Sequence, residues 1–489
     1  MKGAAVAVDC DDKTHRELRQ LRYQIKKLKY QNARYQQQID AATCASDDAK
    51  QQLDDARQLL DLHYVVKNKP LTLAYFPLLT LLLPVTLPMT IYRYLIKRKQ
   101  RRKEKRAKKN KSSAKQRNLE KQSGKAHSIV LNAFWKLKED REQEAFELLE
   151  TRRSEIPDEI IPLFRSATAS DDQTWLDNFN LFLSSLDKPI AVLEASEQPR
   201  FNRIRFSPVK AVTDGPKVSV IMPTFNCEDT VRYAVDSILN QSWQNLELIA
   251  VDDCSQDSTY EILCQIAETD SRLVVLRQTV NGGPYVAKNR ALATAIGEYI
   301  TGHDADDIAL PDRIAVQMQP ILDDPDCQAS IGYMTRLDTD ARFSWPTKVG
   351  SYSFNGACRI ASISLLIQKE VMEFDLGYWD TVRFGADSEL IARAGELLGE
   401  RLVKLETLTM LCLDDASGLT GHVQHGISVE TGMSPSRIEY RDAWRAWHQN
   451  TMPEDRFLPF PHHGADRFFD QPENMKVSDD VIKSLKEYT

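Results

Sequence analysis

The sequence predicts an α/β protein whose main domain, over residues 216–430, contains a doubly wound and mainly parallel β-sheet. Short apolar runs rich in β-branched residues alternate along this domain with segments of helical periodicity, and that alternation is typical of βαβ units. Each apolar run ends in a polar turn that carries acidic or amide side chains. Because open α/β sheets bind ligands at the carboxyl ends of their strands, these turns are the candidate binding loops.

The first strand is predicted in the run KVSVIMPTFN, which begins at Lys217 and stops being strand-like at Pro223. A helix should follow over 229–239, where apolar residues recur at helical spacing. Asp229 is expected to cap this helix, since Asp is a favoured N-cap residue.

Two further strand and helix pairs follow. The run LELIAVDD, residues 246–253, predicts a buried strand that ends in two aspartates and leads to a helix from Thr259. The run LVVLRQ, residues 273–278, predicts the next strand. After the turn NGG, a helix is expected from Val286 to Ala295.

The next strand, in GEYITGHDADD, ends in three carboxylates: Asp304, Asp306 and Asp307. Like charges a few ångströms apart repel by roughly 1 kcal/mol even in bulk water, so an unpaired cluster raises its own pKa values. A hard divalent cation such as Mg²⁺ or Mn²⁺ would relieve this repulsion, since it prefers oxygen ligands. The alternative is a polar loop that only ends a strand.

These motifs resemble family 2 glycosyltransferases of the GT-A fold over about residues 216–425. The segments VSVIMPTFN, VDDCSQDS, NGGPYVAKNRAL and DADD carry the resemblance. It implies that Asp304 and Asp306 bind the metal as a DxD motif. It also implies a set of nucleotide-sugar contacts: Pro223, Thr224, Asn226, Asp252, Asp253, Asn281, Lys288 and Asp304.

The chain departs from the family at the residue expected to face the donor diphosphate. The family usually has Arg there, whereas this chain has Lys288, followed by Asn289 and Arg290. Lys neutralises phosphate as a point charge but cannot form the two-pronged contact of Arg. The assignment of Lys288 therefore depends on its charge alone.

The segment RFGADSEL, residues 383–390, is similar to the family's Gly-Glu-Asp segment, whose Asp is the catalytic base. Ala386 stands at the Glu position and Asp387 is retained, so the resemblance implies that Asp387 takes the proton of the acceptor hydroxyl. The alternative is that Asp387 caps a helix, and the two roles are compatible. Glu389 is the nearest substitute if Asp387 only caps.

The segment DDASGLTGHVQHG, residues 414–426, resembles the part of the family that closes over the nucleotide sugar. It lacks the basic or His residue often found near Asp415. His422 or His425 is then a further candidate metal ligand, because neutral imidazole binds metals readily. The alternative is a solvated loop histidine.

The eight cysteines are dispersed, and no CxxC pair occurs. This pattern argues against a zinc site and against a disulfide scaffold, and it fits a reducing compartment.

The net charge of −6 hides a basic block between Lys97 and Lys125, with fifteen Lys or Arg against Glu104 and Glu120. Such a block could bind nucleic acid, but its position beside an apolar segment favours anionic lipid headgroups instead.

That apolar segment, residues 70–92, contains no charge, and a 22-residue helix would reach about 33 Å, enough for a hydrocarbon core of about 30 Å. We expect a membrane anchor over 70–96 and a basic linker over 97–127. The positive-inside rule places the linker and the main domain on the cytoplasmic side of the inner membrane. Pro77, Pro84 and Pro88 leave a re-entrant anchor open, and a buried soluble helix is the other alternative.

Residues 1–69 carry apolar side chains at heptad positions a and d over about six heptads, which predicts a coiled coil. Asn32 at an a position favours a homodimer, although the weak middle of the seam leaves a helical hairpin or an isolated amphipathic helix open. A helical region is expected over 128–215, and a closing helix with a tail over 431–489.

The resemblance implies an inverting, metal-dependent glycosyltransferase of the hexosyltransferase type. Its partners would be a nucleotide-sugar donor, most simply a UDP-sugar, and a glycan or glycolipid acceptor in surface polysaccharide assembly. No QxxRW motif is present, which argues against a processive synthase. A nucleotidyltransferase is an alternative, although PTFN replaces the glycine-rich phosphate loop of such enzymes. An inactive membrane scaffold is the other.

Overall fold

The computed structural model describes residues 126–347, 353–415, 418–419, 422, 425–428, 432–464 and 467–485. These residues belong to one compact unit, Gln122–Thr489. The coiled coil predicted over 1–69, the membrane anchor over 70–96 and nearly all of the basic linker over 97–127 lie outside the described residues. None of the described helices combines the length and the hydropathy that crossing a bilayer requires.

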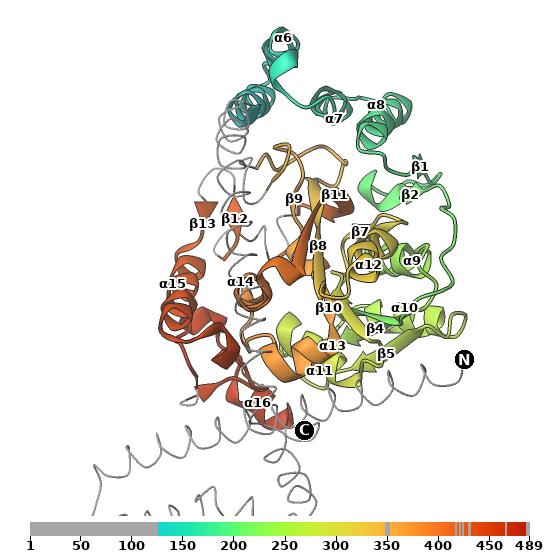
Figure 1. The fold of residues 1–489 in the computed structure, drawn as a ribbon. Helices are drawn as coiled ribbons and strands as arrows, with labels where there is room; N and C mark the ends of the chain where they lie inside the picture. The colour runs from blue at the N-terminus through green and yellow to red at the C-terminus, as the bar shows by residue number, and fades with distance from the viewer. Residues whose placement is uncertain are drawn as a thin grey trace, which may run out of the picture. The chain divides into compact units, whose positions relative to one another are not determined.

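One mixed sheet forms the centre of the unit, with the strand order β5-β4-β3-β6-β10-β8-β11-β7 and with β9 paired to β8 (Figure 1). Its strands are β3 (Val218–Thr224), β4 (Leu246–Asp252), β5 (Leu273–Arg277), β6 (Tyr299–Gly302), β7 (Ile308–Ala309), β8 (Ala329–Leu337), β9 (Arg359–Ile360), β10 (Leu366–Gln368) and β11 (Leu402–Leu413). Two short hairpins, β1 (Ala191–Leu193) with β2 (Ile204–Phe206) and β12 (Ile427–Ser428) with β13 (Gly432–Met433), lie outside it.

The prediction of a mainly parallel sheet is correct for its first half only. Strands β5, β4, β3 and β6 pair in parallel. Beyond β6, strand β10 is antiparallel to both β6 and β8, and β7 is antiparallel to β11, while β8 and β11 are parallel. The chain reaches β10 from β8 through β9 without a helical crossover, and only parallel neighbours require such a crossover.

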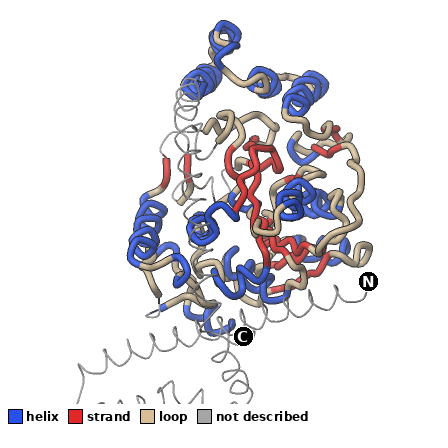
Figure 2. Tube along the Cα trace, viewed as in Figure 1, coloured by secondary structure: helices blue, strands red, loops and turns tan. Residues whose placement is uncertain are grey.

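Helices surround this sheet (Figure 2). In the main domain they are α9 (Val231–Leu239), α10 (Thr259–Ala267), α11 (Pro284–Thr294), α12 (Arg313–Asp323), α13 (Lys369–Val371) and α14 (Ala386–Leu398). Helix α11 packs against β3 and β4, and α12 packs against β8 and β11. Helix α9 begins after Thr230 and has no side-chain cap, so the prediction that Asp229 caps it is wrong.

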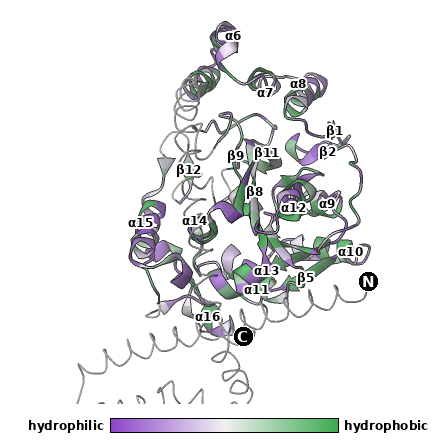
Figure 3. Cartoon of the chain, viewed as in Figure 1, coloured by the Kyte–Doolittle hydropathy of each residue, from purple (hydrophilic) through white to green (hydrophobic). Residues whose placement is uncertain are grey.

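The core follows the apolar strands. Every residue of β4 is buried, and all of β3 is buried except Pro223, which is half-buried. Figure 3 shows hydrophobic residues along the central strands and hydrophilic residues on the outer helix α15 (Pro435–Asn450). Near-continuous apolar strands of this kind are typical of parallel sheets that are covered on both faces.

The helical region predicted over 128–215 begins with a helix over 126–138, followed by the helices α6 (Glu142–Thr151), α7 (Ile160–Ala167) and α8 (Asp172–Ser185) and the hairpin β1/β2. Trp175 stacks on Phe179 at 4.5 Å between ring centroids, and its Nε1 donates to the carbonyl of Ala341 at 2.9 Å. Phe343 packs against Phe134 and Phe164. The helical region therefore shares its core with the loop that follows β8.

The closing helix predicted within 431–489 is α15. After it, the tail packs back onto the main domain and ends in α16 (Asp479–Leu485). Val481 and Ile482 of α16 are buried against Val286 of α11. The tail therefore contributes to the packing of a helix that carries candidate site residues.

Candidate functional site

The turn HDADD after β6 is fixed by helix α9. The hydroxyl of Tyr233 donates to the carbonyl of Asp306 at 2.9 Å, and Thr230 Oγ1 donates to the carbonyl of Ala305 at 2.9 Å. The buried carboxylate of Asp307 accepts the backbone N–H of Leu413 at 3.1 Å, which ties the turn to the end of β11. Asp307 is therefore an anchor, whereas Asp304 keeps 44% of its side-chain surface exposed.

Asp304 and Asp306 fit a hard divalent cation. Desolvation, and secondly the charge of Asp304, raise the pKa of Asp306 to about 6. Desolvation also raises the pKa of Asp304, against the opposing charge of Lys288. Two carboxylates that are costly to ionise side by side supply both the oxygen ligands and the charge that Mg²⁺ or Mn²⁺ prefers.

In the described part of the chain, no group of three or more His, Cys, Asp or Glu residues could hold a metal ion. His422 is therefore not brought together with Asp304 and Asp306. Its ring stacks on His425 at 4.9 Å, and His425 stacks on Phe384 at 5.5 Å. A metal at Asp304 and Asp306 would complete its shell with donor phosphate oxygens and water, as Mg²⁺ usually does.

Lys288 of α11 joins the carboxylate turn to the predicted base. Its Nζ lies 3.1 Å from both carboxylate oxygens of Asp387 and 3.8 Å from Oδ1 of Asp304. Burial alone would lower the pKa of Lys288, but Asp387 and Asp304 outweigh burial and hold the pKa above its usual value. The ammonium therefore stays charged and shields the two carboxylates from each other.

Asp387 accepts two further hydrogen bonds, from the hydroxyl of Tyr285 at 3.1 Å and from Trp379 Nε1 at 2.9 Å. Its side chain keeps 21% of its surface exposed. Three donors thus hold the carboxylate in one orientation while a solvent-facing edge remains open to a reactant.

The alternative that Asp387 caps a helix is wrong. Helix α14 begins at Ala386, and its N-cap residue is Gly385, which has a left-handed φ of 91°. Because the N-cap residue is a glycine, no side chain of its own caps the helix. Instead the hydroxyl of Tyr285 accepts the backbone N–H of Gly385 at 3.1 Å. The first turn of α14 is therefore capped by a side chain from α11, and the carboxylate of Asp387 is free to face Lys288.

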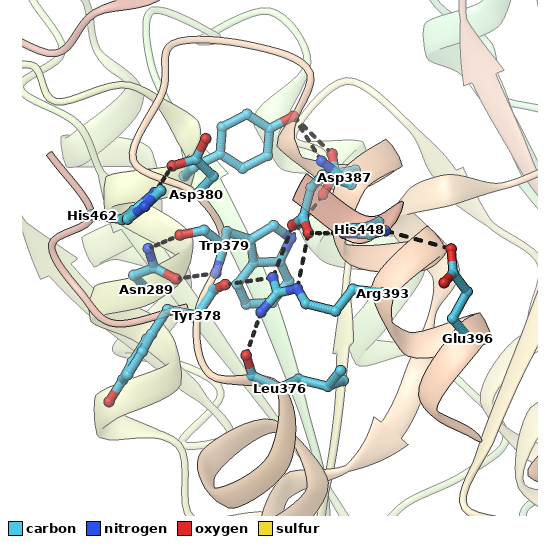
Figure 4. Close-up of polar contacts among 12 residues, drawn as sticks. Asn289, Leu376, Tyr378, Trp379, Asp380, Asp387, Arg393, Glu396, His448 and His462 are labelled. Carbon is cyan, nitrogen blue, oxygen red and sulfur yellow. Dashed lines mark hydrogen bonds and ion pairs between the residues drawn. The ribbon is translucent and has the colours of Figure 1, made fainter. Parts of the chain in front are cut away.

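Glu389, the predicted substitute, has a structural role. It is fully buried, pairs with Arg393 at 2.9 Å and accepts from His448 Nε2 at 3.0 Å. Arg393 also donates to the carbonyls of Leu376 and Tyr378 (Figure 4). Through Arg393, Glu389 therefore positions the segment 376–378 before α14.

Trp379 lies between Asn289 and Asp387 (Figure 4). The amide of Asn289 donates to the carbonyl of Trp379 at 2.9 Å and accepts its backbone N–H at 3.0 Å. Trp379 was not predicted from the sequence as a site residue. Its only signal in the sequence is indirect, since Asn289 follows Lys288 in the motif and is fully buried.

The neighbouring Asp380 is also fully buried and binds the C-terminal tail. It accepts from Tyr440 at 2.8 Å, from His462 Nδ1 at 2.7 Å and from both terminal nitrogens of Arg467. Burial opposes ionisation, but His462 and Arg467 outweigh it and hold the pKa of Asp380 well below its usual range. No sequence signal linked these residues, which are 60 to 87 positions apart.

The loop after β3, which is predicted to contact the nucleotide, is hydrogen-bonded to the loop after β4. The side chain of Asn226, which has a positive φ of 46°, accepts the backbone N–H of Gln256 at 2.8 Å. Thr224 is buried and donates to the carbonyl of Val251 at 3.3 Å. Asp252 is fully buried and lies 3.2 Å from Nε of Arg277. These residues order the loops at the ends of β3 and β4, and their contact with a donor stays a prediction.

Asp253 anchors the NGG turn. Its carboxylate accepts the backbone N–H groups of Gly282 at 2.7 Å and Gly283 at 2.6 Å, and Gln278 Nε2 at 2.6 Å. Asn281 donates to the carbonyl of Asp253 at 3.2 Å. The structure thus gives Asp253 an anchoring role that the sequence did not predict. Its contact with a donor stays a prediction.

Comparison with known proteins places this arrangement among glycosyltransferases. Residues 219–369 match the family described as Glycosyl transferase family 2. Glycosyltransferase GlyG of Streptococcus pneumoniae is 30% identical over 205 residues, which cover 38% of this chain and 67% of the relative.

An Escherichia coli enzyme, UDP-Glc:alpha-D-GlcNAc-diphosphoundecaprenol beta-1,3-glucosyltransferase WfaP, is 38% identical over 101 residues, covering 21% of this chain and 39% of the relative. Three other curated relatives are likewise matched over only 39 to 43% of their lengths. Among solved structures, S. aureus TarS 1-349 in complex with UDP is 22% identical with a TM-score of 0.34, covering 41% of this chain and 61% of that one.

Proposed function

The chain belongs to glycosyl transferase family 2, and on that premise we propose that it transfers a sugar from a UDP-sugar to a hydroxyl group of a glycan or glycolipid acceptor. The expected role is in surface polysaccharide assembly. The relative whose name specifies a UDP-glucose donor and a lipid-linked acceptor supports this choice of substrates.

The observation that carries the proposal is the contact between Asp387, Lys288 and Asp304. A general base must lie within hydrogen-bond reach of the proton that it removes, and Asp387 is ordered by three donors with an open edge. Asp387 takes the acceptor proton as the acceptor oxygen forms its bond to the anomeric carbon. The bond from that carbon to the diphosphate breaks on the opposite face, which inverts the configuration.

The leaving nucleoside diphosphate carries away the electron pair of the broken bond, so positive charge near it accelerates the reaction. Lys288, which keeps its charge despite its burial, supplies part of that charge. When bound by Asp304 and Asp306, Mg²⁺ or Mn²⁺ would supply the rest as a Lewis acid.

The rest of the proposal concerns residues outside the described part. An anchor over 70–96, as a transmembrane or re-entrant segment, would hold the enzyme at the inner membrane, and the basic linker over 97–127 would keep the catalytic domain in the cytoplasm. The coiled coil over 1–69 would form a homodimer. No nucleic acid partner is proposed.

The test is a calorimetric titration of the full chain with UDP, GDP and CMP, each with and without Mn²⁺. We expect UDP to bind at least tenfold more tightly with Mn²⁺, and Asp306→Asn to lose this enhancement. Asp340→Asn, which changes an exposed aspartate in the same way, is the matched control. Absence of binding by all three nucleotides would contradict the proposal and favour the inactive scaffold.

A further inference from the structure

Four polar atoms of strands β8 and β9 and of the segment 344–347 are buried without a hydrogen-bond partner in the described structure: Arg336 Nε, Ser344 Oγ, Thr347 Oγ1 and Arg359 Nε. We call these residues, with Trp345, the Trp345 cluster. The guanidinium carbons of Arg336 and Arg359 lie 5.6 Å and 5.3 Å from the centre of the Trp345 ring. Both cations therefore lie within cation–π distance of one indole ring.

Backbone contacts hold the cluster together. The N–H of Ser344 donates to the carbonyl of Arg336 at 3.1 Å, and the N–H of Thr347 donates to the carbonyl of Gly356 at 2.9 Å. Arg359 is paired with Met334 of β8. The unsatisfied atoms thus belong to ordered strands and to the loop between them.

The cluster has an excess of positive charge. Arg336 pairs with Asp414 at 3.5 Å, and no described carboxylate forms an ion pair with Arg359. Burial, and then the charge of Arg336, lower the pKa of Arg359 to about 10, so the side chain is still a cation at neutral pH. Arg359 is half-buried, its Nε has no hydrogen-bond partner among the described residues, and Asp414 is the one described carboxylate that acts on its charge, so an anion bound beside it would be favourable.

The chemistry of the four atoms selects the kind of anion. Guanidinium groups only donate, and both hydroxyl groups can donate, so the missing partner is a group rich in acceptors. Leaving a buried donor unsatisfied is unfavourable, so a binding partner that accepts from these atoms would be stabilised. A phosphate group offers several acceptor oxygens, and Arg recognises it with two parallel hydrogen bonds.

The cluster adjoins the carboxylate turn from the second half of the sheet. Arg336 is opposite Cys412 in the β8/β11 register, next to Leu413, whose N–H is bound by Asp307. Its charge also opposes the raised pKa values of Asp304 and Asp306. Lys288, by contrast, lies on α11 against β3 and β4 of the first half.

We propose that the Trp345 cluster binds a phosphate group of the acceptor, with Arg359 and Arg336 donating to its oxygens and Trp345 forming one wall of the subsite. This proposal rests on the proposed function. The donor diphosphate is assigned to Lys288 and the carboxylate turn, so a second phosphate subsite on the other half of the sheet is available to the acceptor.

The test is a calorimetric titration of the full chain with inorganic phosphate and with methyl phosphate, alone and in the presence of Mn²⁺ and saturating UDP. The variants are Arg359→Gln, Arg359→Lys and the control Arg342→Gln. Arg342 lies after β8 on the same loop as Ser344 and Thr347, but its side chain is 54% exposed and pairs with Asp340. UDP affinity, measured for each variant, reports whether the protein is folded.

We expect the wild-type chain to bind both probes with and without UDP. Arg359→Gln should weaken phosphate binding at least tenfold, since a charged hydrogen bond contributes about 1.5–3 kcal/mol. Arg359→Lys should weaken it less, and Arg342→Gln should leave it unchanged, with UDP affinity the same throughout. Unchanged phosphate affinity in Arg359→Gln, or no phosphate binding by the wild type, overturns the proposal.

Displacement of phosphate by UDP would also overturn it, because the subsite would then belong to the donor. The proposed function fails separately. If the wild-type chain binds phosphate through Arg359 but does not bind UDP, the anion subsite stands and the donor assignment does not.

Discussion

Lys288 is the residue on which the charge balance of the site depends. Its single ammonium lies 3.1 Å from both oxygens of Asp387 and 3.8 Å from Asp304, and it is almost completely buried. Without it, the two carboxylates would lose the cation between them, and their repulsion would favour protonation. An Arg, as is usual in the family, is longer and planar and would not fill the same buried position without rearrangement.

Asp387→Asn should therefore separate binding from turnover. The amide retains the shape of the side chain but cannot remove a proton, so we expect UDP affinity within about twofold of the wild type and a turnover 10²–10⁴-fold lower. Steady-state kinetics of donor hydrolysis or transfer, together with the UDP titration, measure both quantities. Asp326→Asn, in an exposed loop, is the control, and full turnover in Asp387→Asn would remove the base assignment.

Asp253 should make the stability of the fold depend on pH. Burial raises the pKa of Asp253 to about 6, above the value of about 3.9 in an unfolded chain. Between pH 4 and pH 6 the folded state then binds more protons than the unfolded state, so the contribution of this group to stability falls as the pH rises.

Urea unfolding at pH 4.5, 5.5 and 6.5 tests this dependence, with a total effect of up to about 2–3 kcal/mol for a shift of this size. Asp253→Asn should lose this component of the pH dependence. An identical pH profile for the variant and the wild type would show that Asp253 is ionised throughout the range.

At the level of secondary-structure elements, periodicity in the sequence predicts helices α9, α10, α11 and α15 and the first four strands of the sheet, but it predicts neither helix α12 nor the long strands β8 and β11. It does not predict β7 and β9, of two residues each, or β10, of three, because a strand of that length shows no alternation. Helix capping is equally hidden, since α14 is capped by Tyr285, one hundred residues before Gly385.

Tyr285→Phe tests whether this long-range cap also positions the base. The change removes a hydroxyl that accepts from Gly385 and donates to Asp387 while retaining the ring. We expect a loss of about 1 kcal/mol in the free energy of unfolding and a lower kcat with unchanged UDP affinity. Tyr333→Phe, at a buried tyrosine of β8, is the control. An unchanged kcat would limit Tyr285 to capping.

At the scale of the whole described unit, the site depends on residues 431–489, which the sequence placed outside the main domain. Helix α15 contributes Tyr440, and the tail contributes His462 and Arg467; together they hold Asp380 beside Trp379. The resemblance predicts individual substrate-contacting residues, because family motifs are short and local in sequence. The supporting contacts are polar pairs between distant segments, and neither composition nor periodicity reveals which distant residues will meet.

Deleting residues 1–125 tests whether the membrane anchor and the catalytic unit are separate parts of the chain. The described residues already contain the complete sheet, its covering helices and the candidate site, and they belong to the compact unit Gln122–Thr489. The apolar segment 70–92 and the basic block lie in the deleted part. We therefore expect the shortened protein in the soluble fraction, with UDP affinity within about twofold of the full chain, since its folded unit is intact. Deleting 1–69 alone retains the apolar segment and should leave the protein with the membrane. A shortened protein that still sediments with the membrane would show that residues 126–489 contain a second membrane contact, and the single-anchor prediction would be wrong.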